Sequence, residues 1–515
     1  MHMRFVCSSL FDIALGLVSA QAAEHVRLVT DKSVYLAGEH VLCSVAVFDD
    51  DVLSDASAVS YVELVSSDGL AAETKVALIG GRGAGVMNLP TGIATGAYKI
   101  FAFTSSGSYA ETSEILVFNT GSSAKVRGGV EICESPAPAP ESHDIIPLGF
   151  TLALRRTEGE IEYLLGNDSG SDRWVAVSVT EEDGLAATEG TQIIRLSPGL
   201  PESEGEIIKA RVFGKDARKV CSSPWLTAII SAPGSPADTY TGKIGEDGTI
   251  VFNTNNIYGD KDLVCEILGA EDYRFDCHFG PLSPFFVPDG LSFAKLQLSR
   301  SQKTALIARH KALQETKACL DTMYEFLPKR DNLLLCLQDM QSYNLDDYTR
   351  FPTVEDIILE LIPNVVVRKV NGQKKIKLSL NDVGTKRRGD NVLVTLDGVP
   401  VTAHERLLSY DALALAEVQV YPYVYVMGNT IFNGVVNFIT ARHDMSALAF
   451  DDNVRIMDFR GCSYPVALRM RDGGGSQGGR TLIWEPLLKL GAGQTVSFKV
   501  QDSGQVLSVR IHDMN

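Results

Sequence analysis

Two stretches decide most of what the sequence predicts: NVLVTLDGVPV at residues 391–401 and NGVVNFIT at residues 433–440. In the first, a β-forming run leads into Asp397 and Gly398, where glycine tolerates the positive φ of a tight turn. The second begins with Asn433 and Gly434, another turn pair, and continues as a strongly β-forming run. We therefore expect one strand to end before Asp397 and another to begin after Gly434.

A short helix is expected upstream of these strands. Thr353 is placed to cap its first turn, because a threonine hydroxyl can satisfy free backbone N–H groups there. Glu355 and Asp356 follow in the first turn, where the helix dipole favours negative charge. Pro363 ends the helix after about Leu361. Helix and strands together predict a small α+β domain.

The order and spacing of these turns and strands, with Glu417–Tyr421 and Gly428 between them, resemble the plug domain of TonB-dependent outer-membrane receptors. The resemblance covers about Thr353 to His443 and defines a plug-like domain over 343–445. A receptor also has a barrel after its plug, and the 74 residues after Ala441 are too few. A barrel of about 22 strands needs well over roughly 200 residues in strands alone. The resemblance implies association with outer-membrane machinery rather than transport by this chain.

The predicted plug-like domain is locally basic within a chain whose formal net charge is −17. Such a patch can steer docking onto an acidic partner, and the alternative is a solvated basic face. The three tyrosines of the sequence YPYVY alternate, which predicts one face of a strand, either exposed as a recognition strip or buried as core. The candidate partner-binding residues are Arg368, Lys369, Lys374, Lys375, Lys386, Arg387, Arg388, Tyr421, Tyr423 and Tyr425.

Residues 24–120 predict a β-sandwich, because short β-forming runs alternate with Gly, Asp and Ser turns. The run from Tyr98 to Phe103 is apolar on both faces and is therefore expected to be a central strand. Asp31, Tyr35, Gly38–Glu39, Tyr61–Leu64, Leu89–Pro90 and Gly96–Tyr98 resemble the macroglobulin-type immunoglobulin-like domain, and a generic β-sandwich is the alternative.

The rest of the chain divides by composition. We expect a Pro-rich linker at 121–144, a second small β-unit at 145–200 and a helical connector at 288–342. Residues 201–287 resemble a carboxypeptidase-regulatory type of β-sandwich, and 446–515 predict a C-terminal β-unit.

The N-terminus predicts export. Arg4 precedes an apolar stretch from Phe5 to Val18, and Ala20-Gln-Ala22 has the small-x-small form that signal peptidase accepts. Residues 1–22 are therefore a predicted signal peptide, with a buried first strand as the alternative. The eight cysteines after it lack C-x-x-C pairs and are expected to be mostly free, with Cys265 and Cys277 the first pair to test for a bridge.

Composition and motifs exclude several functions. The net charge of −17 disfavours nucleic acid, which needs Lys and Arg against phosphate. No apolar stretch beyond the N-terminus is long enough for a membrane-spanning helix. No zinc spacing, P-loop or thioester sequence occurs. The Ser292-x-x-Lys295 tetrad lacks the companion motifs of a serine nucleophile, and Asp49–Asp51 fits a solvated turn better than a calcium site. We expect no catalytic residue, metal or cofactor.

These observations predict a mainly β protein with several Ig-like or macroglobulin-type sandwiches and a small α+β plug-like domain. The expected function is that of an exported, non-enzymatic binding or assembly protein of the periplasm or outer membrane. Its expected partner is an integral outer-membrane protein. The alternative is a surface adhesin or ligand-binding protein that uses its sandwiches for recognition.

Overall fold

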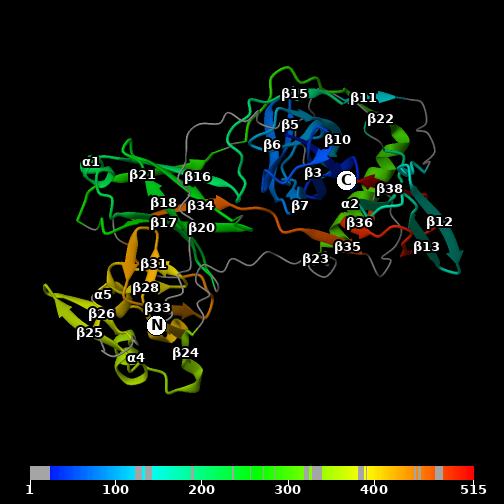
Figure 1. The fold of residues 1–515 in the computed structure, drawn as a ribbon. Coiled ribbons are helices and arrows are strands. Elements are labelled where there is room, and N and C mark those ends of the chain that lie inside the picture. Colours follow the sequence, from blue (N-terminus) through cyan, green and yellow to red (C-terminus); the bar gives the residue numbers. More distant parts are fainter. Residues whose placement is uncertain are drawn as a thin grey trace.

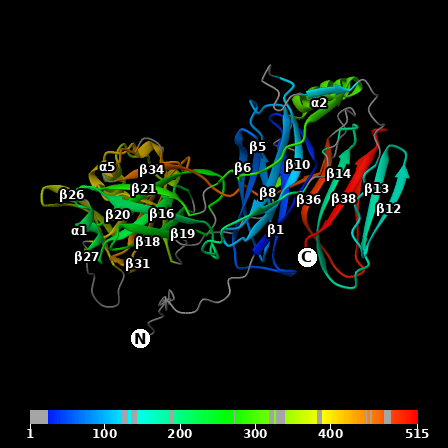
Figure 2. The ribbon, with the colours of Figure 1, turned by 90° about the horizontal axis from the view of Figure 1, so that it is seen from above.

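The computed structural model of the 515-residue chain contains three lobes: a pair of stacked β-sandwiches, a rolled β-sheet and an α/β domain (Figure 1). From above, the sandwiches lie on one side and the other two lobes on the other (Figure 2). The prediction of a mainly β protein is confirmed. The structure describes residues 24–121, 130–133, 142–185, 187, 191–234, 237–255, 257–270, 272–282, 285–317, 324–326, 339–380, 388–389, 391–445, 448–450, 454–469 and 480–515. The signal peptide and most of the Pro-rich linker lie outside these residues.

The N-terminal sandwich consists of two sheets over one core. The first sheet contains β1 (Glu24–Thr30), β3 (His40–Asp49), β4 (Val52–Leu53) and β7 (Arg82–Asn88). The second has the order β2 (Val34–Leu36), β10 (Ser113–Phe118), β8 (Gly96–Phe103), β5 (Val59–Ser66) and β6 (Gly69–Ala77). Strand β8 is central, as expected. Tyr98 and Ile100 face the sandwich core, whereas Phe101 and Phe103 belong to a separate cluster on the outer face.

A second sandwich is built from segments far apart in the sequence. One sheet contains β12 (Phe150–Thr157), β13 (Glu160–Asn167) and β37 (Thr495–Gln501). The other contains β23 (Tyr324–Phe326), β35 (Val466–Arg469), β36 (Thr481–Leu490), β14 (Arg173–Glu181) and β38 (Leu507–Asp513). The sequence predicted separate β-units over 145–200 and 446–515, and the structure corrects this by pairing their strands. A separation of about 300 residues adds little to the entropy cost of pairing, so sequence distance does not prevent it.

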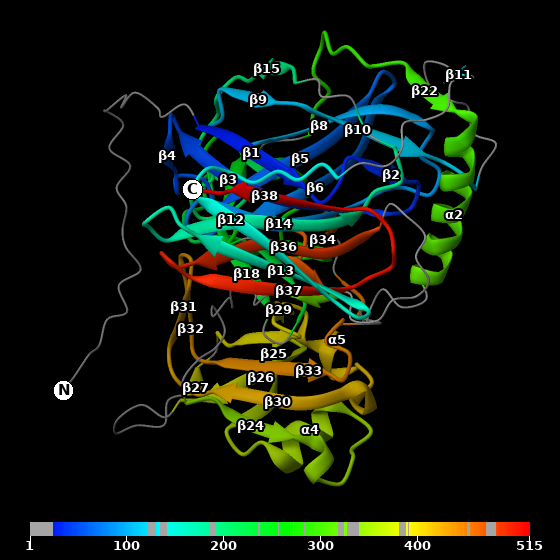
Figure 3. The same cartoon turned by 90° about the vertical axis from the view of Figure 1, so that its right-hand side faces the viewer.

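The two sandwiches pack face to face. Phe48 of the first and Trp484 of the second share a buried cluster, and Ser44 Oγ donates to the carbonyl of Pro486 at 2.7 Å. Helix α2 (Arg300–Lys317), in the predicted helical connector, runs beside them (Figure 3). Short strand pairs complete this half: β9 (Tyr109–Glu111) with β15 (Ile193–Arg195), and β11 (Val130–Cys133) with β22 (Leu296–Ser299).

The rolled sheet has seven strands around its own core. Their order is β21 (Asp276–Pro281), β16 (Ile207–Phe213), β19 (Thr249–Asn253), β18 (Asp238–Ile244), β17 (Thr227–Ala232), β20 (Asp260–Leu268) and β34 (Arg455–Arg460), and helix α1 (Ala217–Cys221) lies before β17. Strand β34 comes from the predicted C-terminal unit. The five described cysteines outside strand β11, which include Cys265 and Cys277, are free thiols. Burial raises the pKa of Cys277 to about 12, so its thiol is protonated at neutral pH.

A buried polar joint connects the rolled sheet to the N-terminal sandwich. Lys75 Nζ on β6 lies 2.7 Å from a carboxylate oxygen of Glu206, and both side chains are almost fully buried. Tyr61 Oη on β5 donates to Glu202 at 2.9 Å. Phe285 and Phe286 add edge contacts to the aromatic cluster on β5 and β8. Polar and aromatic contacts therefore fix this joint together.

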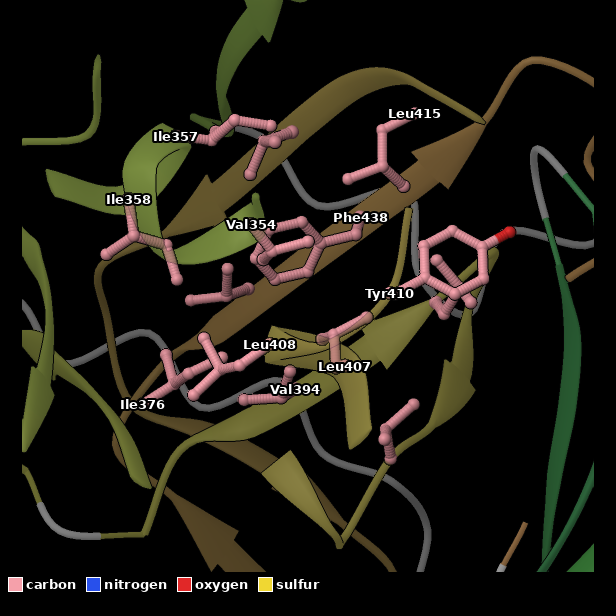
Figure 4. Packing of buried hydrophobic residues seen from close by; sticks show 14 of the residues in the cluster. Val354, Ile357, Ile358, Ile376, Val394, Leu407, Leu408, Tyr410, Leu415 and Phe438 are labelled. Atoms are coloured by element: carbon pink, nitrogen blue, oxygen red, sulfur yellow. The ribbon is translucent and has the colours of Figure 1, made fainter. Parts of the chain in front are cut away.

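The α/β domain covers the described residues from 339 to 450. Its sheet has the order β24 (Gln341–Asn344), β30 (Leu415–Tyr421), β33 (Val435–Thr440), β28 (Leu393–Leu396) and β29 (Val399–Pro400). Helices α4 (Val354–Leu361) and α5 (His404–Leu408) cover a core that includes Phe438 (Figure 4). The hydroxyl of Thr353 accepts the N–H of Asp356 at 3.1 Å, which confirms the predicted cap. A smaller sheet contains β25 (Val365–Val370), β26 (Gln373–Ser379) and β27 (Arg388–Gly389), and β31 (Tyr425–Met427) pairs with β32 (Thr430–Phe432).

Candidate binding surface on the α/β domain

The Asp397–Gly398 turn anchors the α/β domain to the rolled sheet. Both residues have positive φ, 49° and 78°, and they connect β28 to β29. The buried carboxylate of Asp397 accepts the N–H of Thr440 at 2.8 Å and that of Met445 at 2.8 Å. The Asp397 carbonyl accepts the N–H of Gly234 in the rolled sheet at 3.1 Å. One turn therefore joins the strand core, the segment after β33 and the neighbouring lobe.

A second anchor is the hairpin β31–β32, which reaches toward the rolled sheet (Figure 1). Thr430 and Thr227 form a hydroxyl–hydroxyl hydrogen bond of 2.9 Å, and Asn429 N–H donates to the Thr227 hydroxyl at 3.2 Å. Gly428, at the bend of the hairpin, has a φ of 57°, and a Cβ there would lie 2.6 Å from the Thr227 methyl. Only glycine fits this bend without displacing its neighbour.

The hairpin β25–β26 carries the predicted basic patch. Arg368 lies opposite Lys375, and Lys369 lies opposite Lys374, in the antiparallel register. Arg368 and Lys369 are exposed, and the other two are half-buried. Like charges directly opposite one another destabilise a strand pair, and an anion next to Arg368 and Lys375 would offset this cost.

The two faces of this hairpin differ. On the face toward α4, Lys374 pairs with Glu355 at 2.5 Å, and the backbone N–H of Lys374 donates to Glu405 at 2.8 Å. On the opposite face lie Arg368, Lys375 and Lys377, since alternate residues of a strand share a face. The two carboxylates that contact this hairpin, Glu355 and Glu405, therefore both bind Lys374, whose side chain lies on the face toward α4.

His404 of α5 lies beneath the hairpin. Its Nδ1 accepts the N–H of Ile376 at 2.9 Å, so the neutral ring carries its proton on Nε2. Burial first, and then the nearby Lys375 charge, lower the His404 pKa to about 4. The ring is therefore neutral at physiological pH, and Nε2–H is a hydrogen-bond donor.

The three tyrosines are not on one strand. Strand β30 ends at Tyr421 and β31 begins at Tyr425, because Pro422 cannot donate to a ladder and the chain bends around Tyr423. All three side chains are half-buried. Tyr421 and Tyr425 pack against the buried cluster between the α/β domain and the rolled sheet. The prediction that the three tyrosines share one face of a strand is therefore wrong: they lie around the bend between β30 and β31.

The structure brings together only part of the predicted set. Lys386 and Arg387 lie outside the described residues, and Arg388 is described only by its backbone pairing with Ser379 on β26. Asn433 donates its N–H to the Asn391 carbonyl at 2.6 Å. At Gly434, whose φ is 94°, a Cβ would lie 2.7 Å from the Tyr421 carbonyl oxygen and closer still to Leu378.

Sequence reasoning missed three residues beside this patch: Lys377, His404 and Trp225. Lys377 had a signal, because it alternates with Lys375 along a β-forming run and must share its face. His404 had none, since its role depends on the packing of α5 against β26. Trp225 comes from the rolled sheet's lobe, and no local pattern places it next to residues 365–380. Among the described residues, no group of His, Cys, Asp and Glu side chains is suited to hold a metal ion.

No known protein family matches the chain, and no curated protein matches it. Solved structures give weak similarities. The native α2-macroglobulin of Escherichia coli is 10% identical, with 92% of this chain and 22% of that chain covered and a TM-score of 0.17. Methylamine-reacted α2-macroglobulin from Salmonella is 7% identical, with 95% and 39% covered and a TM-score of 0.17. The adhesin InvE of Yersinia pseudotuberculosis is 11% identical, with 50% and 58% covered and a TM-score of 0.14.

The chain therefore spans less than two thirds of the length of each of these proteins. TM-scores this low do not establish a shared fold. The plug resemblance rests on the sequence motifs alone. Among the described residues, no helix is both long and apolar enough to cross a membrane.

Proposed function

We propose that the chain is an exported, non-enzymatic binding protein of the bacterial envelope. Its sandwiches serve as a scaffold, and its α/β domain docks on an acidic surface of an integral outer-membrane protein. The observation that carries the proposal is the exposed hairpin β25–β26, in which Arg368 lies opposite Lys375 and Lys369 opposite Lys374.

The charge arrangement supports docking for an energetic reason. Lys374 is already paired with Glu355, whereas the pair of Arg368 and Lys375 destabilises the hairpin by up to about 1 kcal/mol, and a carboxylate from a partner would reverse that sign. Because the chain as a whole has a net charge of −17, an acidic partner is attracted to the basic hairpin rather than to the rest of the surface. Attraction of this kind is screened by salt, with a Debye length of about 8 Å at physiological ionic strength.

The scaffold supports the same proposal. The α/β domain is attached through the Asp397–Gly398 turn and the hairpin β31–β32, while β25–β26 extends outward (Figure 1). A hairpin held in this way meets a partner with little further loss of freedom, which favours association.

The test is crosslinking in intact cells with a charge-reversal variant, Arg368→Glu with Lys369→Glu. Both side chains are exposed, so the fold should persist. The matched control is Lys209→Glu with Arg211→Glu, which reverses two exposed cations on β16 of the rolled sheet. We expect the hairpin variant to lose capture of outer-membrane proteins at least tenfold and the control to retain it. Equal capture by both variants would refute docking through this hairpin.

A second candidate is ligand recognition by the N-terminal sandwich. A cavity of about 710 Å³ lies between strands β6 and β7 and the segment 460–466, and Arg460, Glu73 and Tyr464 line it. Arg460 and Glu73 form an ion pair of 2.7 Å there. An extracellular ligand that crosslinks to this cavity, with capture unaffected by the hairpin variant, would favour the adhesin alternative.

A further inference from the structure

A cavity of about 690 Å³ lies between the α/β domain and the rolled sheet. Its walls come from both lobes: Trp225 and Leu268 on the rolled-sheet side, and Lys375, Lys377 and His404 on the other. Cavities of about 300–1,000 Å³ with apolar walls and a few convergent polar groups are typical of small-molecule sites.

The charged side chains that line this cavity are both lysines, and its neutral polar lining comes from His404, Asn391, Thr402, Asn429 and Thr430. Lys375 and Lys377 are alternate residues of β26, so their side chains lie along the same face, and Lys375 Nζ donates to the Thr402 carbonyl at 3.4 Å. His404 adds a third donor, because its Nδ1 is occupied by the Ile376 N–H and the proton is on Nε2. Among the described residues, no carboxylate lines the cavity. The polar side therefore favours an anion.

The remaining wall is apolar and unusually exposed. Trp225 is 63% exposed and Ile431 is 62% exposed, and Val370 at the hairpin tip is 37% exposed. Phe432 and Leu393 lie deeper, in the buried cluster between the lobes. Large apolar side chains exposed beside a cavity mark a ligand or partner surface, because leaving them in water is unfavourable.

We propose that this cavity binds a small amphipathic organic anion, with an acidic head at Lys375, Lys377 and His404 and an apolar body against Trp225 and Ile431. The site goes beyond the proposed docking role: Lys375 belongs to both surfaces, Lys377, His404 and Trp225 belong to the cavity, and the docking test changes only Arg368 and Lys369. The ligand bridges two lobes, so its binding also holds the α/β domain against the rolled sheet.

The test uses a matched pair of fluorescent probes. One is 8-anilinonaphthalene-1-sulfonate, and the other is N-phenyl-1-naphthylamine, which has the same ring system without the sulfonate. Energy transfer from tryptophan to the probe reports binding next to Trp225. We expect saturable sulfonate binding by the full chain, with transfer lost in Trp225→Phe and kept in Trp174→Phe, which replaces a tryptophan of the second sandwich.

The decisive variant is Lys375→Ala with Lys377→Ala, compared with Lys209→Ala as a control outside the cavity. Loss of two charged donors should weaken sulfonate binding by about tenfold or more and leave binding of the uncharged probe unchanged. A melting temperature equal to that of the wild type shows that the double variant is folded. Unchanged sulfonate affinity, or an equal loss for both probes, would overturn the proposal.

Discussion

Replacing Glu63 by glutamine should reduce the loss of unfolding free energy that the protein shows as the pH rises. Glu63 lies where the N-terminal sandwich meets the rolled sheet. Glu63 is fully buried on β5, and its Oε1 accepts the N–H of Phe286 at 2.9 Å. Its Oε2 is buried and has no hydrogen-bond partner among the described residues. Burial, with Glu73 directly opposite on β6, raises the Glu63 pKa to about 8 from an ordinary value of 4.5.

The sign follows from proton binding. A carboxyl whose pKa is raised on folding contributes its full stability below about pH 4.5, and this stability is lost as the pH rises to about 8. A tenfold change in proton affinity is worth about 1.4 kcal/mol, so the total loss is on the order of 5 kcal/mol at most. Glu202, whose pKa burial raises to about 7, changes in the same direction.

Chemical denaturation at pH 5 and pH 8.5 measures the effect. The wild type should lose several kcal/mol of unfolding free energy between these values, whereas Glu63→Gln should lose distinctly less and be the more stable protein at pH 8.5. Glu111→Gln, at an exposed position on β9, serves as the control. If wild type and Glu63→Gln lose the same stability over this range, Glu63 is not a protonated carboxyl in the folded chain and the reasoning is wrong.

Three further outcomes are expected. Export predicts a mature chain that begins at about Ala23, and mass spectrometry that finds Met1 on the bulk of the envelope fraction would contradict it. Gly398→Val should open the α/β domain and leave residues 24–120 intact, because a β-branched residue at a φ of 78° costs on the order of 1–3 kcal/mol; limited proteolysis measures this, and unchanged protection would refute it. Gly434→Ala should lower the stability of the same domain by at least about 2 kcal/mol in urea denaturation, because its positive φ is combined with an overlap with neighbouring atoms; a smaller loss would show that the backbone adjusts.

The parts of the fold that local chemistry dictates were predictable from sequence. Thr353 caps α4 as its hydroxyl requires, and the strand before Asp397 ends in a turn with two positive φ values. The central position of β8 followed from apolar residues on both of its faces. Each of these features depends on residues within about ten positions of one another, where propensity and periodicity carry the information.

Long-range pairing was not predictable in the same way. Strand β36 pairs with β14 although the intervening chain contains the rolled sheet and the α/β domain, and β34 pairs with β20 although the α/β domain lies between them in sequence. The sequence of β36 shows that a buried strand forms, and it contains nothing that selects β14 as the partner. Many pairings are compatible with one hydrophobic pattern, so the choice depends on how the whole chain packs.

The candidate site divides along the same line. Arg368, Lys369, Lys374 and Lys375 were predicted as part of a locally basic region because they are close in sequence, and the structure brings them together on one hairpin, two on each face. Whether that surface binds a partner depends on what lies across from it, and the structure places Trp225 there from another lobe. A lysine pair alone binds water and salt, whereas a lysine pair facing an exposed tryptophan selects molecules with both an acidic head and an apolar body. The ligand preference of this cavity therefore depends on the contact between the α/β domain and the rolled sheet, which no local stretch of sequence specifies.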